Sequence, residues 1–276
     1  MNVKLSFGIA ISFLAASSSA TSLIVVSSAG EIRELVLSGF IASDTVFRGT
    51  VPSGGRIIAA ADFDANGTAD LILQYDPDGP GNRPMGTFLW RFDGPSRISV
   101  TQLGGVPSSY TEPVGIMDVD KDGNYEYLMY NPANHAVKAF EVLRSSPYAG
   151  GERTVIAGGL GLSFQRVVAV GDTNGDGNDD LLLQDSSTLN LKWRHLAGVS
   201  TLSLGNPMVT NPVPGMPVGV GHLGHPRTER PSVIFNSPDG VAPREVWTVT
   251  GDNVIDYGEI RFDEAYRSWP IVAVAP

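Results

Sequence analysis

The sequence predicts an all-β protein: a β-propeller of four-stranded blades, with five blades and a ring closed by strands from both chain ends. Three observations predict it. An acidic loop between two apolar runs recurs along the chain, an aromatic residue recurs with a similar period, and each interval contains four short strand-like segments. The 32 Gly and 19 Pro residues favour short elements joined by turns over long helices. A β-sandwich with coincidental spacing is the alternative.

The first twenty residues predict a secretory signal peptide. Lys4 precedes an apolar run from Leu5 to Ala16, and Ser18 with Ala20 suits a small-x-small cleavage site. A membrane anchor is the alternative, but this run is shorter than the roughly 20 residues that span a bilayer. We therefore expect export, with the protein secreted, periplasmic or on the cell surface and no membrane insertion after cleavage. The chain has no Cys, so disulfides cannot stabilise it.

The repeat is defined by two series of residues. The first position of each loop falls at Asp62, Asp118, Asp172 and His222, with spacings of 56, 54 and 50 residues. The aromatic series is Trp90, Phe140, Trp193 and Trp247, with spacings of 50, 53 and 54 residues. A period near 50 residues is typical of propeller blades.

Each unit contains the segments of one blade. A run rich in Val, Ala and Gly comes first, and its small residues suit the crowded axis where blades converge. The acidic loop and a second apolar run follow, which together predict a hairpin. The strand with the aromatic residue and a weaker alternating strand complete the blade. The predicted units are 56–111, 112–165, 166–215 and 216–268.

The two chain ends predict one shared blade. Residues 269–276 resemble the first strand of another unit, and residues 21–55 supply later strands without a first one. Pairing them would make 21–276 a single domain and would remove the exposed edges of an open sheet.

Three loops share one pattern of oxygen-bearing side chains. Positions 1, 3, 5 and 9 are acidic or amide residues, and position 6 is Gly67, Gly123 or Gly177. Oxygen ligands on alternate residues around a flexible Gly are typical of a Ca²⁺ site. Position 7 could add a backbone carbonyl. The predicted ligands, for about three ions, are Asp62, Asp64, Asn66, Thr68 and Asp70; Asp118, Asp120, Asp122, Asn124 and Glu126; and Asp172, Asn174, Asp176, Asn178 and Asp180.

Two other interpretations of these loops are weaker. Asn-Gly and Asp-Gly form tight hairpin turns without a metal, but a turn alone does not explain acids at positions 1, 3 and 9. An EF-hand requires an acid at position 12, where this chain has Leu73, Met129 and Leu183. We expect the loop to close at position 9 and to lead directly into a strand. The second loop, with four carboxylates, should bind Ca²⁺ most tightly.

The fourth unit departs from the pattern. Its loop has His222 and Gly224 at positions 1 and 3, with Arg227 and Arg230 nearby. Two histidines alone are weak evidence for a metal site, so His222 and His225 predict a plain loop. Asp179 in the third loop is not an expected ligand, because Ala69 and Tyr125 take its place in the other copies.

The segments "ADFDANGTADLILQ", "MDVDKDGNYEYLMY" and "GDTNGDGNDDLLLQ" resemble the FG-GAP/VCBS repeats of integrin α-chain heads and of many secreted bacterial proteins. The resemblance implies propeller blades whose acidic loops bind Ca²⁺ between the first two strands. It also implies a ligand-binding or adhesive role more often than catalysis. Seven blades are usual in that family, whereas this sequence predicts five.

The predicted function is a monomeric, non-enzymatic binding or adhesion module stabilised by Ca²⁺. A net charge of −10 argues against nucleic acid as a partner, which leaves a protein or glycan ligand. Side chains that could stack on sugars are Tyr110, Tyr130, Tyr148 and Trp269, although core packing is the more common role of each.

Two alternative functions stay open. One is a glycoside hydrolase or lectin on a five-bladed propeller, and the other is a structural subunit of a cell-surface assembly. A glycoside hydrolase needs facing carboxylates. The acids outside the loops show no recurring or paired context; they include Glu112, Asp185, Asp239, Glu245 and Asp263.

Overall fold

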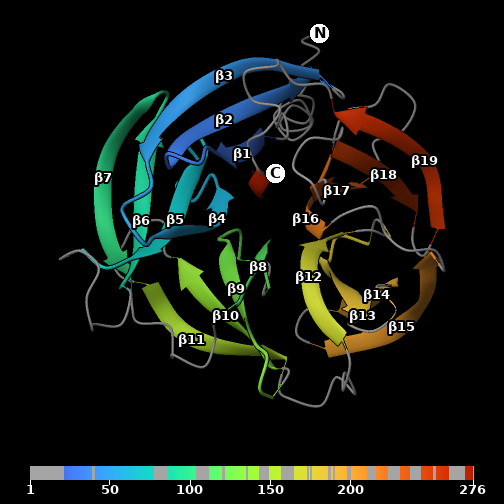
Figure 1. Ribbon diagram of the computed structural model, residues 1–276. Coiled ribbons are helices and arrows are strands. Elements are labelled where there is room, and N and C mark those ends of the chain that lie inside the picture. Colours follow the sequence, from blue (N-terminus) through green and yellow to red (C-terminus); the bar gives the residue numbers. More distant parts are fainter. Residues whose placement is uncertain are drawn as a thin grey trace, which may run out of the picture.

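The computed structural model confirms the predicted fold class. Its described residues are 22–38, 41–77, 86–103, 112–119, 122–134, 136–142, 149–156, 165–172, 174, 176–185, 188, 190–197, 200–209, 216–222, 231–236, 244–250, 253–260 and 271–275. Strands are the only regular elements among them, and they form five four-stranded antiparallel sheets around a common axis (Figure 1). The described residues include no helix long and apolar enough to cross a membrane.

Four of the sheets follow the chain in order. The first contains β4 (Arg56–Ala61), β5 (Asp70–Tyr75), β6 (Gly86–Asp93) and β7 (Ser96–Leu103). The second contains β8 (Glu112–Met117), β9 (Glu126–Asn131), β10 (Ala136–Val142) and β11 (Ala149–Ile156). The third contains β12 (Gln165–Gly171), β13 (Asp180–Asp185), β14 (Leu191–Ala197) and β15 (Ser200–Val209). The fourth contains β16 (Met216–His222), β17 (Pro231–Asn236), β18 (Arg244–Thr250) and β19 (Asn253–Ile260).

The fifth sheet is built from both ends of the chain, as the sequence predicts. It contains β20 (Ile271–Ala275), β1 (Ser22–Val26), β2 (Glu31–Ser38) and β3 (Ile41–Thr50), in that spatial order. β20 pairs antiparallel with β1 and contacts β4 and β16, the first strands of the two neighbouring sheets. The first strands of the other sheets also contact one another in sequence, so the five innermost strands form a closed ring.

A one-residue bulge recurs in every innermost strand. Its extra residue is Ile58 in β4, Val114 in β8, Val168 in β12, Val218 in β16 and Val272 in β20. A bulge bends the strand and increases its twist. The residue after each bulge is small: Ala59, Gly115, Ala169, Gly219 or Ala273.

Gly115 illustrates why small residues stand at the axis. Its φ is +151°, and a Cβ added there would lie 3.4 Å from side-chain atoms of Val170 in the next innermost strand. The sequence-based expectation that small residues suit the crowded axis is confirmed at this position.

The hydrophobic core lies mainly between neighbouring sheets. Between the β4–β7 and β8–β11 sheets, Phe63 and Ile72 pack with Tyr127, Met129 and Phe140. Similar clusters of buried apolar residues lie at three further interfaces between neighbouring sheets. Each sheet is therefore stabilised by apolar burial against its neighbours rather than by a core of its own.

The aromatic series occupies two registers. Trp90 pairs with Leu71 and Phe140 with Tyr127, the residues directly after loop position 9. Trp247 pairs with Val233, which aligns with Leu71 and Tyr127 when the sheets are aligned by their bulges, so it shares this register. Trp193 pairs with Leu182, one residue later. Successive strand residues point to opposite faces, so the position of Trp193 belongs to the opposite face of its sheet from the other three. All four lie in the third strand of a sheet, but despite the near-constant spacing Trp193 does not occupy the equivalent position.

A buried ion pair lies within the fifth sheet, which closes the ring, and its arginine also contacts the first sheet. Arg48 on β3 donates from Nε to Glu34 on β2 at 2.7 Å, and both side chains are almost fully buried. Arg48 also donates to the carbonyl of Gly94 and lies 4.9 Å from the centre of the Phe92 ring. Because Phe92 and Gly94 belong to the β6–β7 hairpin, this contact ties the ring closure to the first full sheet.

Candidate metal-binding loops

The three acidic loops occupy the same place in three neighbouring sheets. Each connects the innermost strand to the second strand, and position 9 is the first residue of that second strand: Asp70 in β5, Glu126 in β9 and Asp180 in β13. The expectation that the loop leads directly into a strand at position 9 is confirmed.

The Gly at position 6 is in the left-handed region in all three loops. The φ angles are +82° for Gly67, +83° for Gly123 and +78° for Gly177. L side chains rarely adopt this conformation, which explains why Gly occupies a position that must turn the chain back towards the sheet.

The position 1 carboxylate organises each loop from within. Asp62 accepts hydrogen bonds from the backbone N–H of Asn66 and Gly67, at 3.0 and 2.8 Å. Asp118 accepts the equivalent pair from positions 5 and 6, and Asp172 accepts from Gly177 at 2.8 Å. These bonds fix the turn, and they show that Asp at position 1 has a structural role independent of any cation.

Position 5 supports the next residue of the loop. Its side-chain oxygen accepts from the backbone N–H of position 7, at 2.8 Å from Thr68 to Asn66 and from Asn124 to Asp122. The third loop repeats this bond from Asn178 to Asp176 at 2.7 Å. Thr68 has a further role, because its hydroxyl accepts from the N–H of Gly94 at 3.1 Å.

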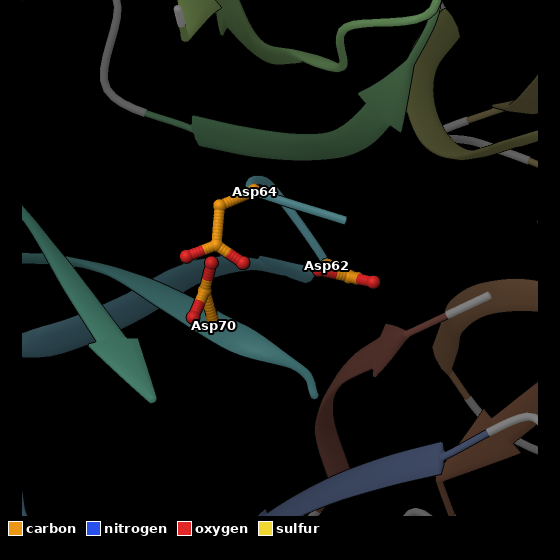
Figure 2. A group of neighbouring side chains, drawn as sticks. All are labelled: Asp62, Asp64 and Asp70. Carbon is orange, nitrogen blue, oxygen red and sulfur yellow. The ribbon is translucent and has the colours of Figure 1, made fainter. Parts of the chain in front are cut away.

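Positions 3 and 9 of the first loop form a carboxylate cluster. One oxygen each from Asp62, Asp64 and Asp70 lies within 4.8 Å of the others, and Figure 2 shows the Asp64 and Asp70 carboxyl groups next to each other. Oδ1 of Asp64 and Oδ2 of Asp70 are buried and have no hydrogen-bond partner among the described residues. Such oxygens are costly to bury, and a cation between them would remove the cost.

Asp70 is fully buried. Its Oδ1 accepts from the N–H of Phe92 at 2.8 Å, so only Oδ2 faces Asp64 without a donor. Burial raises the pKa of the Asp70 carboxyl to about 7; the backbone N–H of Phe92 and, more weakly, that of Phe63 oppose this shift, and the charges of Asp64 and Asp62 add to it. The environment of Asp70 therefore disfavours its ionised form in the absence of a cation.

The second loop has the same electrostatic character. Glu126 is 1% exposed and accepts from the N–H of Val119 at 2.8 Å, while its Oε1 is buried without a hydrogen-bond partner among the described residues. Burial raises the pKa of Glu126 to about 7, the bond from Val119 lowers it, and the charges of Asp118 and Asp122 raise it further. Asp120 at position 3 lies outside the described residues.

The third loop differs at positions 3 and 9. Nδ1 of His195 on β14 lies 3.0 Å from Oδ2 of Asp180 and 3.4 Å from Nδ2 of Asn174. Oδ1 of Asp180 accepts from the N–H of Leu196 at 3.1 Å, so both of its oxygens are engaged. Where the first loop brings two carboxylates together, the third loop places an imidazole between its amide and its carboxylate.

Asp179, which the repeat pattern excludes as a ligand, is nevertheless part of the electrostatics of the third loop. Burial raises its pKa to about 6, and the charges of Asp172 and Asp180 contribute. The charge of Asp118 in the second loop acts in the same direction. Neighbouring loops are therefore close enough to influence each other.

Sequence reasoning missed His195 as a loop residue because of the register of its strand. If Trp193 is aligned with Trp90, His195 takes the place of Phe92, which is a buried core residue. The actual register is shifted by one, which brings His195 beside Asp180 and makes Arg91 its counterpart. His195 lies in the third strand of its sheet, outside the loop, so the residue pattern of the loop gives no indication of it.

The other candidate residues divide into those described and those not. Tyr130 is 2% exposed and packs among Val114, Val137 and Val167, so the core role expected as the more common one is confirmed and sugar stacking is excluded. Tyr110, Tyr148, Trp269, His225 and the predicted signal peptide lie outside the described residues.

The comparisons with known proteins identify no family. No protein-family model and no curated protein matches the chain, so the FG-GAP/VCBS resemblance rests on the loop residues alone. Among solved structures, a chain of a nidogen/laminin complex matches with a TM-score of 0.49 and 11% identity over 92% of this chain and 97% of that one. Predicted 6-phosphogluconolactonases of Bacteroides fragilis and Bacteroides uniformis match with TM-scores of 0.42 and identities of 9% and 11%. These two matches cover 91% and 90% of this chain, respectively, and 70% of each Bacteroides chain.

Proposed function

We propose that the protein is a secreted, calcium-binding β-propeller that acts as a non-enzymatic ligand-binding or adhesion module. The observation that carries the calcium assignment is the pair of buried, unpartnered oxygens of Asp64 and Asp70 in the first loop. Secretion rests on the first twenty residues of the sequence, and adhesion rests on the resemblance of the loops to FG-GAP/VCBS repeats.

We propose further that the five sheets are the complete set of blades. The chain of contacts from β4 through β8, β12, β16 and β20 back to β4 supports this count. A ring closed by pairing β20 with β1 makes the two chain ends mutually dependent. Additional stabilisation of the loops beside the axis would suit a chain without disulfides.

Calcium suits the donor set of the first two loops. Ca²⁺ takes six to eight oxygen ligands in flexible geometry, and the loops offer carboxylate, amide and backbone oxygens. Asp62, Asp64, Asn66 and Asp70 would hold the ion in the first loop, and Asp118, Asp120, Asp122 and Glu126 in the second. In the third loop, a cation at position 9 would require the His195 side chain to move away from Asp180. We therefore expect two ions of higher affinity and a third of lower affinity.

The role of the ions in this proposal is stabilisation. A ligand that binds only the folded state adds about 2.7 kcal/mol per site at 100 times its Kd. The first loop transmits this stabilisation to the ring closure, because Asn66, Thr68 and Asp70 all bond the β6–β7 hairpin that Arg48 contacts.

Thermal unfolding in Ca²⁺ and in EGTA tests this proposal. We expect the melting temperature to be higher by several degrees in 1–5 mM Ca²⁺, since about 1 kcal/mol corresponds to 2–4 °C for a protein of this size. Magnesium at the same concentration is the control for ionic strength and should have a smaller effect, because it favours fewer protein ligands. Identical melting curves in Ca²⁺ and in EGTA would contradict the calcium assignment.

A further inference from the structure

The end of the central ring opposite the acidic loops carries charged residues at equivalent positions. Arg56, Glu112 and Arg166 each pair with the penultimate residue of the second strand: Gln74, Tyr130 and Gln184. They therefore occupy the same register in three consecutive innermost strands, and Met216 takes the position in the fourth. Since β4 rises about 3.3 Å per residue, Arg56 lies about 17 Å along the strand from the loop end.

Both arginines are held in the same way. Oε1 of Gln74 accepts from Nε and Nη2 of Arg56 at 3.1 and 2.8 Å. Oε1 of Gln184 accepts from Nε and Nη2 of Arg166 at 3.3 and 2.8 Å. Gln74 is 5% exposed and Gln184 is 2% exposed. A buried amide thus orients each guanidinium while the arginine itself is only partly buried, as expected of a preorganised binding group.

Glu112 stands between the two arginines in the ring order. Its strand, β8, contacts both β4 and β12. Burial lowers the pKa of the Arg56 guanidinium, and the negative charge of Glu112 acts against this shift. Burial also raises the pKa of the Tyr130 hydroxyl; Glu112 adds to the shift and Arg166 opposes it. These four groups therefore lie within electrostatic range of one another.

We propose that this mouth of the ring, lined by Arg56, Glu112 and Arg166, binds a carboxylated sugar such as a uronic acid residue. The inference rests on the proposed function, since it names the ligand class and the face of that binding module. Guanidinium groups form bidentate hydrogen bonds with carboxylates, and the Glu112 carboxylate accepts from sugar hydroxyl groups.

The two ends of the ring differ in charge. Arg56, Glu112 and Arg166 sum to +1, and Asp76 and Asp185, which follow Gln74 and Gln184 at this end, bring the sum to −1. The opposite end carries the acidic loops, which would repel an acidic ligand more strongly. The two arginines are therefore the groups at this end that would attract a carboxylate.

Isothermal titration calorimetry of the calcium-loaded protein tests the inference with a matched pair of probes. One is an oligosaccharide ending in glucuronate, and the other is the same oligosaccharide ending in glucose. Free glucuronate is a third probe, and it shows whether the ligand is a small hydroxy acid or the end of a glycan. We expect binding of the carboxylated probes, and a loss of affinity of about tenfold to a hundredfold in Arg56→Gln and Arg166→Gln.

Arg97→Gln is the matched control for charge. Arg97 is exposed on the outer strand β7, where it stacks on Trp90 at 4.2 Å, so this variant loses one positive charge far from the axis. It should bind like the parent protein, and melting curves of all variants verify folding. Equal binding of both terminal sugars, or unchanged affinity in both mouth variants, would overturn the inference. Absence of any binding would overturn it too, while the calcium dependence of the melting temperature would still decide the proposed function separately.

Discussion

The first and third acidic loops have nearly the same sequence pattern and different interiors. In the first, Asp64 and Asp70 bring two unpartnered carboxylate oxygens together in a buried space. In the third, His195 lies between Asn174 and Asp180 and engages the position 9 carboxylate. The backbone turn is shared, since Gly67 and Gly177 have almost the same φ. Loop geometry and the need for a cation are therefore separable: the turn forms in both loops, but only the first brings two unpartnered carboxylate oxygens together.

The largest expected effect is the loss of the pH dependence of stability in calcium. The pKa of Asp70 and of Glu126 is raised to about 7 in the folded protein, from 3.8 and 4.5. The folded state therefore holds more protons than the unfolded state between about pH 4 and 7. In EGTA, the free energy of unfolding should fall as pH rises through that window, by up to about 1.4 kcal/mol per pH unit for each group.

Saturating Ca²⁺ should bring this slope close to zero, because the ion holds the carboxylates of the folded protein ionised, as they already are in the unfolded state above about pH 5. Chemical denaturation from pH 5 to 8, in EGTA and in saturating Ca²⁺, measures both slopes. Asp70→Asn is the informative variant, since it should remove the contribution of Asp70 to the slope in EGTA and leave that of Glu126. Parallel slopes in the two conditions would contradict the assignment of a cation to these carboxyls.

Substitution at position 9 should have the next largest effect and should distinguish the first loop from the third. Asp70→Asn removes the buried charge and a calcium ligand, so it should reduce the stabilisation by Ca²⁺ by about 3 kcal/mol, the contribution of one well-occupied site. Asp180→Asn changes the same position where His195 already engages the carboxylate, and should leave most of the calcium effect intact. The difference between melting temperatures in Ca²⁺ and EGTA measures both. Equal losses in the two variants would mean that the third loop binds calcium as the first does.

The sequence predicts the fold because its information is periodic. Small residues at the axis, Gly at position 6 and acids at positions 1 and 9 recur for reasons that act within one blade, and the structure has them where the repeats place them. The pairing of β20 with β1 also follows from the pattern, since each chain end lacks what the other provides.

The interior of the third loop could not be predicted in the same way. It depends on whether Trp90 and Trp193 are equivalent, and their strands differ by one residue in register. A shift of one residue exchanges the faces of a strand, so His195 moves from an expected core position to the loop. Tyr130 shows the same limit: its type suits sugar stacking, and only the packing of the next sheet shows that it is buried.

Opening the third loop should produce a smaller change. His195→Ala removes the imidazole that lies between positions 3 and 9, so Asp180 should become available to a cation. We expect about a tenfold gain in affinity at the weakest site, equivalent to about 1.4 kcal/mol. Equilibrium dialysis with limiting Ca²⁺ measures the change as additional bound ion. An unchanged binding curve would show that His195 does not restrict the site.

The smallest effect should come from substitution of the Gly at position 6, whose left-handed conformation the two loops share. Gly67→Ala and Gly177→Ala each place a Cβ on a residue in the left-handed region, which costs roughly 1 kcal/mol. A Cβ at Gly67 would meet no heavy atom within 4 Å, so its cost arises from the backbone alone. Because the turn is formed by hydrogen bonds to Asp62 and Asp172 rather than by a cation, both variants should lose similar stability in EGTA. Denaturant midpoints in EGTA measure this loss, with Gly54→Ala as a further position at φ +73° outside the loops. A loss that appeared only in Ca²⁺ would mean that the ion, and not Asp at position 1, holds the turn.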